Sequence, residues 1–223
     1  MEKRTYAGIR NDKERSKKKI LDAVGVIVRN EGYSNINILK VSKISGLSRR
    51  LINRYFESVE QLIETYIKSK DYWVAPAGNT GEVMENNKNL DTRSILETLL
   101  VNQLDYVSKE EEMQKILLYQ ISQRSKIMFE VAEEREKLGA EFFKMSDPFF
   151  ENTDIDLRAI TGLLVGGIYY MVLHAKTNDS LFCQIDVNSI EGMNRIKKAV
   201  HEILFDTYKR AEKHKTKKGK HSV

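Results

Sequence analysis

The chain has 223 residues, of which 41% are hydrophobic and 31% charged, with a net charge of +5. This composition predicts one or two globular domains and argues against intrinsic disorder. Two prolines and 12 glycines are too few for an all-β sandwich, and the prevalence of Lys, Glu, Leu and Ile predicts a mostly helical protein. The single cysteine, Cys183, excludes an intrachain disulfide and a multi-cysteine metal site.

The charge is unevenly distributed along the chain. Residues 1–75 contain 16 Lys and Arg against 9 Asp and Glu, a net charge of +7. Residues 76–208 contain 14 against 22, a net charge of −8, and residues 209–223 carry +6. A basic first segment joined to an acidic larger one suggests that the first segment faces a polyanion, although such unevenness also occurs in soluble proteins without that partner.

The sequence predicts a soluble, cytoplasmic protein with no membrane partner. Its first residues are charged and lead into no apolar signal-peptide core. The longest uncharged apolar stretch, 159–175, has 17 residues and includes three glycines, two tyrosines and a histidine. Spanning a bilayer takes about 20 predominantly apolar residues.

Apolar residues at helical spacing predict four helices in the first 75 residues. A tight turn at Ser45-Gly46-Leu47 separates the second helix from the third. The four helices are expected over 12–32, 37–44, 48–56 and a segment that begins at a capping box formed by Ser58 and Gln61.

The stretch Ala75-Pro76-Ala77-Gly78-Asn79-Thr80-Gly81 is the strongest linker signal in the chain. It separates a domain of residues 1–75 from a domain of residues 76–213, and a basic flexible tail is expected over 214–223. The second domain is expected to be helical throughout. Its helices are predicted over 91–108, 109–123, 125–146, 156–177 and 189–213.

The third helix carries the functional signal, because a helical wheel divides it into a polar and an apolar face. The polar face consists of Arg49, Arg50, Asn53 and Arg54. The apolar face consists of Leu51, Ile52, Tyr55 and Phe56. Arg and Asn suit paired hydrogen bonds with the major-groove edges of guanine and adenine. A basic, solvated helix surface is the alternative interpretation, but the preceding short helix, the tight turn and the N-cap residue Ser48 together favour a helix-turn-helix.

At this point the sequence resembles the DNA-binding domain of the TetR (tetracycline-repressor) family of bacterial regulators. The resemblance covers about residues 12–75 and is carried by Gly32-Tyr33, Asn37-Ile38-Leu39-Lys40-Val41-Ser42, Ser45-Gly46-Leu47-Ser48, Leu51-Ile52, Tyr55-Phe56 and Glu60-Gln61-Leu62. It implies an all-α fold, in which an N-terminal three-helix helix-turn-helix domain precedes a larger helical domain for effector binding and dimerisation. The function implied is that of a ligand-released repressor, bound as a homodimer to a pseudo-palindromic double-stranded DNA operator, with an unknown small-molecule effector and no cofactor.

Carried over position by position, the resemblance assigns seven residues to DNA binding: Asn37, Ser48, Arg49, Arg50, Asn53, Arg54 and Tyr55. Three positions depart from the family pattern. Arg50 stands where Gly is frequent, Asn53 where Tyr is frequent, and Val59 where Lys often begins the fourth helix. The last two changes remove common phosphate contacts, one of which Arg50 replaces. Further phosphate contacts are expected from basic residues before the first helix, Arg10, Lys13 and Arg15.

The second domain is expected to contain a subunit interface and an effector pocket. For the interface, the last two long helices contribute Gly162, Gly166, Met193, Ile196, Val200 and Ile203. The alternative is that these helices belong to the core of their own domain. For the pocket, Met and aromatic side chains suit an apolar or aromatic ligand, although such residues more often form a core. The candidates are Met113, Leu117, Gln120, Ile121, Met128, Phe129, Phe142, Tyr169, Tyr170 and His174.

Two other function classes compete with this interpretation. An enzyme finds little support, because the four histidines are scattered and no glycine-rich phosphate loop follows a strand. No catalytic residue and no metal site is therefore predicted. The third class is a helical DNA-binding regulator whose C-terminal half binds a protein partner and no small molecule.

Overall fold

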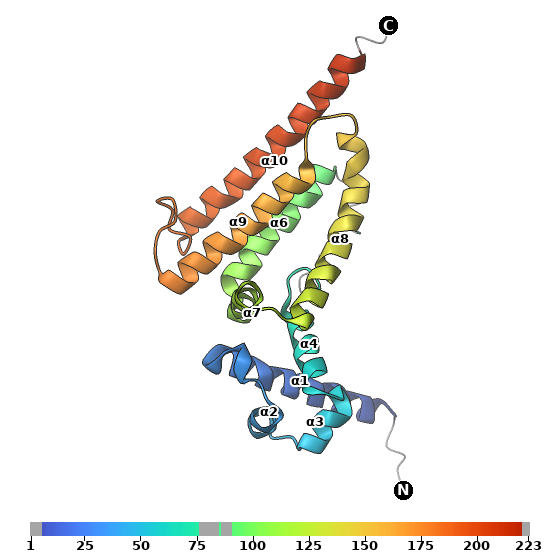
Figure 1. The fold of residues 1–223 in the computed structure, drawn as a ribbon, viewed down its shortest axis with the longest axis vertical. Coiled ribbons are helices and arrows are strands. Elements are labelled where there is room, and N and C mark those ends of the chain that lie inside the picture. The colour runs from blue at the N-terminus through green and yellow to red at the C-terminus, as the bar shows by residue number, and fades with distance from the viewer. Residues whose placement is uncertain (1–5, 76–84, 86–90, 220–223) are drawn as a thin grey trace. The chain divides into compact units, whose positions relative to one another are not determined.

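The computed structural model describes residues 6–75, 85 and 91–219, with side chains described over 12–75, 85 and 91–214. This part of the chain forms nine α-helices and one short 3-10 helix, and contains no β-strand (Figure 1). The all-α expectation is confirmed. Most of the predicted linker, from residue 76 onward, lies outside the described residues.

The chain divides into two compact units. The N-terminal unit comprises Met1–Asp71 and Glu111–Val131, and the C-terminal unit comprises Tyr72–Glu110 and Ala132–Val223. This division differs from a single boundary near residue 75, because the segment 111–131 belongs with the N-terminal helices.

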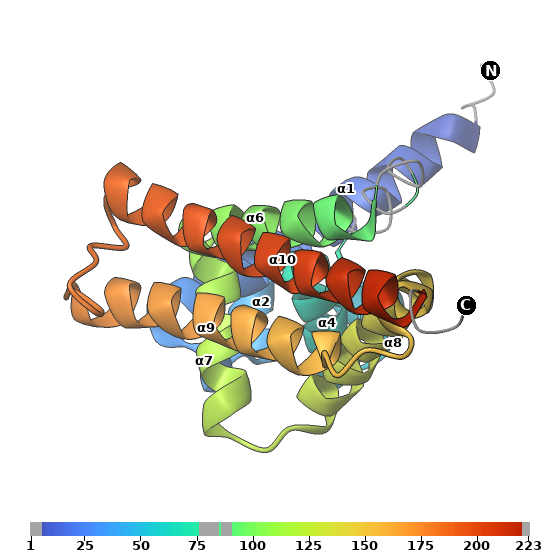
Figure 2. The same ribbon diagram turned by 90° about the horizontal axis from the view of Figure 1, so that it is seen from above.

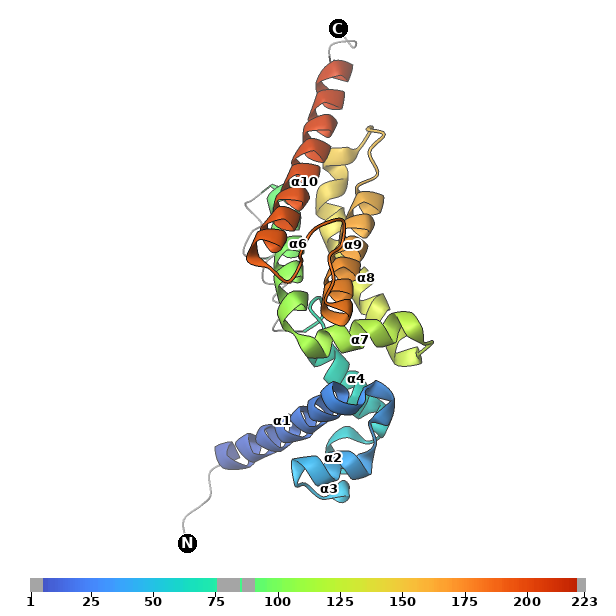
Figure 3. The same ribbon diagram turned by 90° about the vertical axis from the view of Figure 1, so that its left-hand side faces the viewer.

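The N-terminal unit is built around the first helix. In Figure 3, α2 and α3 lie beside each other on one side of α1. The unit contains α1 (Tyr6–Glu31), η1 (Tyr33–Asn35), α2 (Ile38–Ser45), α3 (Arg49–Phe56), α4 (Val59–Lys70), α7 (Glu111–Ser122) and the first turn of α8 (Lys126–Phe150). Its apolar core includes Ile20, Val24, Ile27, Val41, Ile52, Phe56 and Leu62. Helix α1 begins six residues before the predicted start at Asp12, because the apolar spacing used for the prediction records only the buried part of a helix.

One carboxylate attaches α7 to the N-terminal unit. Glu112 is 8% exposed and forms salt bridges with Arg29 of α1 and, at 2.9 Å, with Lys70 of α4. The Tyr66 hydroxyl, fully buried on α4, donates a hydrogen bond of 2.9 Å to its Oε2. Gly25 leaves room for this carboxylate, because a Cβ atom at that position would lie 2.8 Å from Glu112 Oε1. The segment 111–131 therefore joins this unit through a contact between residues about 80 positions apart.

The C-terminal unit is organised around α6 (Thr92–Lys109), which packs against both α9 (Leu157–Asn178) and α10 (Ile190–Gly219). Figure 2 shows these three helices running alongside one another. Salt bridges link α10 to one side of α6, where Lys197 pairs with Asp105 at 2.7 Å and His201 approaches Glu97 at 2.9 Å.

Two helices of this unit continue past their predicted ends. Helix α8 runs through Pro148 to Phe150; Phe149 and Phe150 both pack against Tyr208 of α10, with ring centroids 5.0 and 4.8 Å apart. Aromatic packing thus favours one more turn, although proline supplies no backbone donor. Helix α10 extends to Gly219, into the segment 214–223 that was predicted as a flexible tail. Residues 220–223 lie outside the described residues.

Candidate nucleic-acid interface

The turn between α2 and α3 is fixed by local hydrogen bonds. Asn37 caps α2, with its side-chain oxygen accepting from the Lys40 backbone amide at 3.0 Å. Gly46 ends α2 in the left-handed conformation, with φ of 69°, which glycine adopts without steric cost. The Ser42 hydroxyl then donates to the Leu47 carbonyl at 2.8 Å. These contacts give the tight geometry of a helix-turn-helix.

Helix α3 presents the predicted polar face to solvent. Ser48 caps its start, accepting from the Leu51 amide at 3.3 Å. Ile52 and Phe56 are 1% and 3% exposed and anchor the opposite face in the core. The exposed side chains are Arg49, Arg50, Asn53 and Arg54. Because the buried face is fixed, these three cations and one amide project together from a rigid helix whose N-terminus also has positive character.

Two lysines that the sequence did not single out lie near the end of α3, on the side of Tyr55 and Phe56. Tyr55, half-buried at the end of α3, lines an open depression together with Lys17 and Lys18 of α1. Lys13 and Arg15 are exposed on α1 and so stand within the helix, not before it. The Arg10 side chain lies outside the described residues. The same depression is also lined by the carboxylates Glu14, Asp22 and Glu57, so its charge is mixed.

No protein-family model and no curated protein matches the chain. Solved structures do match it. FadR from Bacillus subtilis, a transcriptional regulator in complex with stearoyl-CoA, is 16% identical with a TM-score of 0.62, covering 84% of this chain and 96% of that one. The fatty acid degradation regulator FadR from Bacillus halodurans is 16% identical with a TM-score of 0.60, over 85% and 94% of the two chains. A TetR family transcription regulator from Marinobacter aquaeolei VT8 is 14% identical with a TM-score of 0.60, over 86% and 97%.

The chain has the fold of TetR-family transcriptional regulators. The expected resemblance is thereby confirmed at the level of the fold. The solved structures reported above are named as regulators. Within the described residues, no group of three His, Cys, Asp or Glu side chains is placed to hold a metal ion.

In this TetR-like fold the predicted pocket residues fall into two groups. Met113, Leu117, Gln120, Ile121, Met128 and Phe129 belong to the N-terminal unit, and Phe142, Tyr169, Tyr170 and His174 to the C-terminal unit. Met113, Leu117, Met128 and Phe142 are buried, whereas Ile121 and Phe129 are 75% and 64% exposed. Tyr169 accepts a hydrogen bond of 2.8 Å from the Trp73 indole. Tyr170 and His174 stack near the loop after α9.

The predicted interface residues also separate into two sets. Ile196 and Val200 are 6% and 3% exposed and pack in the core of the C-terminal unit, and Met193 is partly buried. Ile203 is 43% exposed. On α9, both Gly162 and Gly166 are exposed, and a Cβ atom at either would meet nothing within 4 Å.

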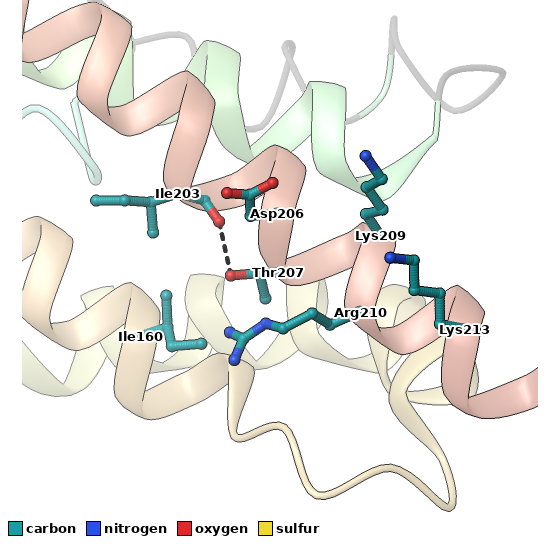
Figure 4. A pocket seen from close by; sticks show the side chains of 7 residues that line it. All are labelled: Ile160, Ile203, Asp206, Thr207, Lys209, Arg210 and Lys213. Atoms are coloured by element: carbon teal, nitrogen blue, oxygen red, sulfur yellow. Dashed lines mark hydrogen bonds between the residues drawn. The ribbon is translucent and has the colours of Figure 1, made fainter.

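A shallow depression lies between α9 and α10 (Figure 4). The figure shows Ile160 on α9 facing a row of α10 side chains across it. The α10 residues are Ile203, Asp206, Thr207, Lys209, Arg210 and Lys213. The depression is therefore apolar where the two isoleucines meet and basic along one border.

The outward face of α3 allows base reading to be separated from phosphate contact. Asn53 lies one turn beyond Arg49 and Arg50, and its amide can donate to and accept from the N6/N7 edge of adenine. We expect Asn53→Ala to cost about 1–3 kcal/mol in DNA binding and to relax discrimination at one base pair per half-site. Arg54→Ala should weaken binding to all sequences alike and lower the salt slope by about one for each phosphate that is no longer neutralised.

Binding of both variants to a library of operator substitutions checks this assignment. An Asn53→Ala protein that keeps full discrimination at every position would show that Asn53 reads no base. Arg54→Ala serves as the matched control, since it removes a neighbouring polar side chain from the same exposed face.

Proposed function

We propose that the chain is a transcriptional regulator that binds double-stranded DNA through α3, acts as a homodimer and releases its operator when a small molecule binds. The observation that carries this proposal is the exposed polar face of α3, held by a capped, glycine-terminated turn. The transcriptional regulators that share the fold support it. Repression is the proposed mode of action, in the cytoplasm, where operator DNA is accessible.

An exposed apolar surface on α9 supports the homodimer. Leu163 and Tyr170 are 78% and 56% exposed and lie seven residues apart, with the exposed Gly166 between them. Helix α9 is long and apolar enough to cross a membrane by length and composition, yet only 22% of its most apolar window is buried. A soluble protein covers such a face with a partner. We assign the partner as a second copy, because two related subunits hold the two half-sites of a pseudo-palindrome.

The proposed effector is a long-chain acyl compound. FadR from Bacillus subtilis, which shares the fold, was solved with stearoyl-CoA. The buried polar side chains of the C-terminal unit, within the described residues, are Gln103, Ser146 and Thr207, none of which is charged. An apolar interior without a buried charge suits the uncharged part of such a molecule.

Salt dependence of DNA binding tests the proposal. A preferred duplex would first be selected from a random pool and its affinity then followed by fluorescence anisotropy. We propose that five exposed cations per subunit contact phosphates: Arg49, Arg50, Arg54, Lys13 and Arg15. We expect affinity to fall roughly a thousandfold or more between about 50 and 200 mM salt, because phosphate contacts release counterions.

A shuffled duplex of equal length is the control and should bind more weakly at every salt concentration. An affinity that barely changes over this range, or the absence of any selected sequence, would contradict the DNA-binding assignment.

A further inference from the structure

A buried amide without a partner marks the interior of the C-terminal unit. Gln103 is 0% exposed, and within the described residues neither its side-chain nitrogen nor its side-chain oxygen has a hydrogen-bond partner. It shares a helical stripe of α6 with Leu96, Leu99 and Val107, all buried. A leucine would suit this stripe better, because an unpaired amide in an apolar interior is unfavourable.

The other buried polar groups of this unit are satisfied within their own helices. The Ser146 hydroxyl donates to the Phe143 carbonyl at 3.2 Å, and the Thr207 hydroxyl to the Ile203 carbonyl at 2.7 Å. Among the described residues, Gln103 has no such hydrogen bond to a carbonyl of its own helix. Buried polar groups in folded proteins are nearly always paired, so an unpaired amide at this position indicates a bound water or ligand as its partner.

A pair of aromatic side chains lies within one turn of Gln103 along α6. Tyr106 is one turn along α6 from Gln103, and its ring centroid lies 5.6 Å from that of Tyr72. The Tyr72 hydroxyl donates to the Leu99 carbonyl at 2.8 Å, one turn before Gln103. The pKa of the Tyr72 hydroxyl lies well above its usual value, mainly because the group is buried and to a smaller extent because Tyr169 is nearby. These contacts place an uncharged aromatic pair within one turn of the unpaired amide on α6.

We propose that Gln103 is the polar recognition residue of the effector site, and that its amide hydrogen-bonds the carbonyl of an uncharged acyl group, such as a thioester. This inference rests on the proposed function and specifies the ligand chemistry that the C-terminal unit recognises. The amide nitrogen donates to the acyl oxygen, and the neighbouring aromatic rings contact the hydrocarbon part. Neither of the two depressions described above includes Gln103.

An uncharged carbonyl is favoured over a carboxylate by the surroundings of the amide. The acidic residues of α6 that pair with α10, Glu97 and Asp105, lie on a different side of the helix from Gln103. No buried Lys or Arg is available among the described residues of this unit to neutralise an anion. A thioester therefore binds more tightly than the corresponding free acid, because a buried carboxylate would stay uncompensated.

The test compares two methionine variants of the full chain. Gln103→Met removes the amide at nearly constant volume, and Asn102→Met is the control, since Asn102 is exposed on the same helix. Binding of stearoyl-CoA, stearate and free CoA is measured by titration calorimetry, and the melting temperature of each unliganded protein is recorded. We expect Gln103→Met to melt at a higher temperature than the wild type and to bind stearoyl-CoA roughly tenfold more weakly or worse. Asn102→Met should change neither quantity.

The outcomes separate this inference from the proposed function. Equal stearoyl-CoA affinity in the wild type and Gln103→Met would overturn it, as would a wild type that binds neither stearoyl-CoA nor stearate. A lower melting temperature in Gln103→Met with unchanged binding would show a purely structural amide and would also overturn it. Stearate that binds as tightly as stearoyl-CoA, with both weakened by Gln103→Met, would overturn the preference for an uncharged carbonyl. Failure to select any DNA sequence would count against the regulator assignment and leaves the ligand comparison intact.

Discussion

If the proposed homodimer forms through α9, replacing Gly166 by leucine is expected to convert it into monomers and to weaken operator binding. Gly166 lies in the middle of the exposed α9 surface, where close approach of a second subunit requires the absence of a side chain. A leucine there would hold the two subunits apart, and we expect the dimer dissociation constant to rise roughly a hundredfold, the effect of losing an interface hot spot. Operator affinity should fall by a factor on the order of 100 or more, because one subunit no longer holds the other at its half-site.

The same substitution leaves the isolated subunit intact. A Cβ atom at Gly166 meets nothing within 4 Å in its own subunit, and glycine inside a helix is roughly 0.5–1 kcal/mol less favourable than alanine. Gly166→Ala is the matched control, because it brings the same helical benefit with a much smaller side chain. Sedimentation velocity reports the assembly and circular dichroism the helix content. A wild-type monomer, or a Gly166→Leu protein that remains dimeric, would remove the homodimer proposal.

The second large effect is expected at Glu112. Glu112→Leu should lower the free energy of unfolding of the N-terminal unit by about 3 kcal/mol, because breaking a buried charged network leaves its partners uncompensated. The Tyr66 hydroxyl, fully buried, would lose its acceptor, and Arg29 and Lys70 would lose the carboxylate that holds α1 and α4 to α7. Glu112→Gln should lose less, since its amide oxygen still accepts from Tyr66.

Glu111→Leu is the control, because Glu111 is the adjacent carboxylate and is exposed. Hydrogen exchange followed by mass spectrometry localises the change, and α1, α4 and α7 should exchange faster in Glu112→Leu alone. If protection in these helices stays at the wild-type level, the carboxylate contributes no net stability and α7 is held by apolar packing.

The helices and caps of the N-terminal unit followed from the sequence because their causes are local. The predicted caps Ser48 and Ser58 each accept a hydrogen bond from the backbone amide three residues later, as Asn37 does at the start of α2. The division of α3 into two faces depends only on the angle between successive residues, so the exposure of its arginines and the burial of Ile52 could be predicted. Local hydrogen bonds and periodicity need no knowledge of what a helix packs against.

The C-terminal unit shows where this reasoning stops. The sequence analysis assigned Ile196, Val200 and Ile203 of α10 to a single subunit interface. In the structure, Ile196 and Val200 are buried within the subunit and Ile203 is exposed. The apolar composition of α9 is typical of a core helix, yet only 22% of its most apolar window is buried. A helix with two apolar faces needs two partners, and the sequence does not state which face each partner covers.

Glu112 and Gln103 show the same limit for polar residues. Glu112 stands in a run of three glutamates that resembles a solvated helix start, and nothing nearby in the sequence marks its partner Arg29, 83 positions away. Gln103 could have been noticed as a polar break in the apolar stripe of α6, but its missing hydrogen bonds are visible only when the surrounding helices are in place. The sequence alone determined the helices, their caps and the exposed face of α3, because each depends on neighbours within one or two turns. Tertiary structure decided which carboxylate is buried, which amide is unpaired and which apolar face stays open, because burial is set by contacts between residues far apart in the chain.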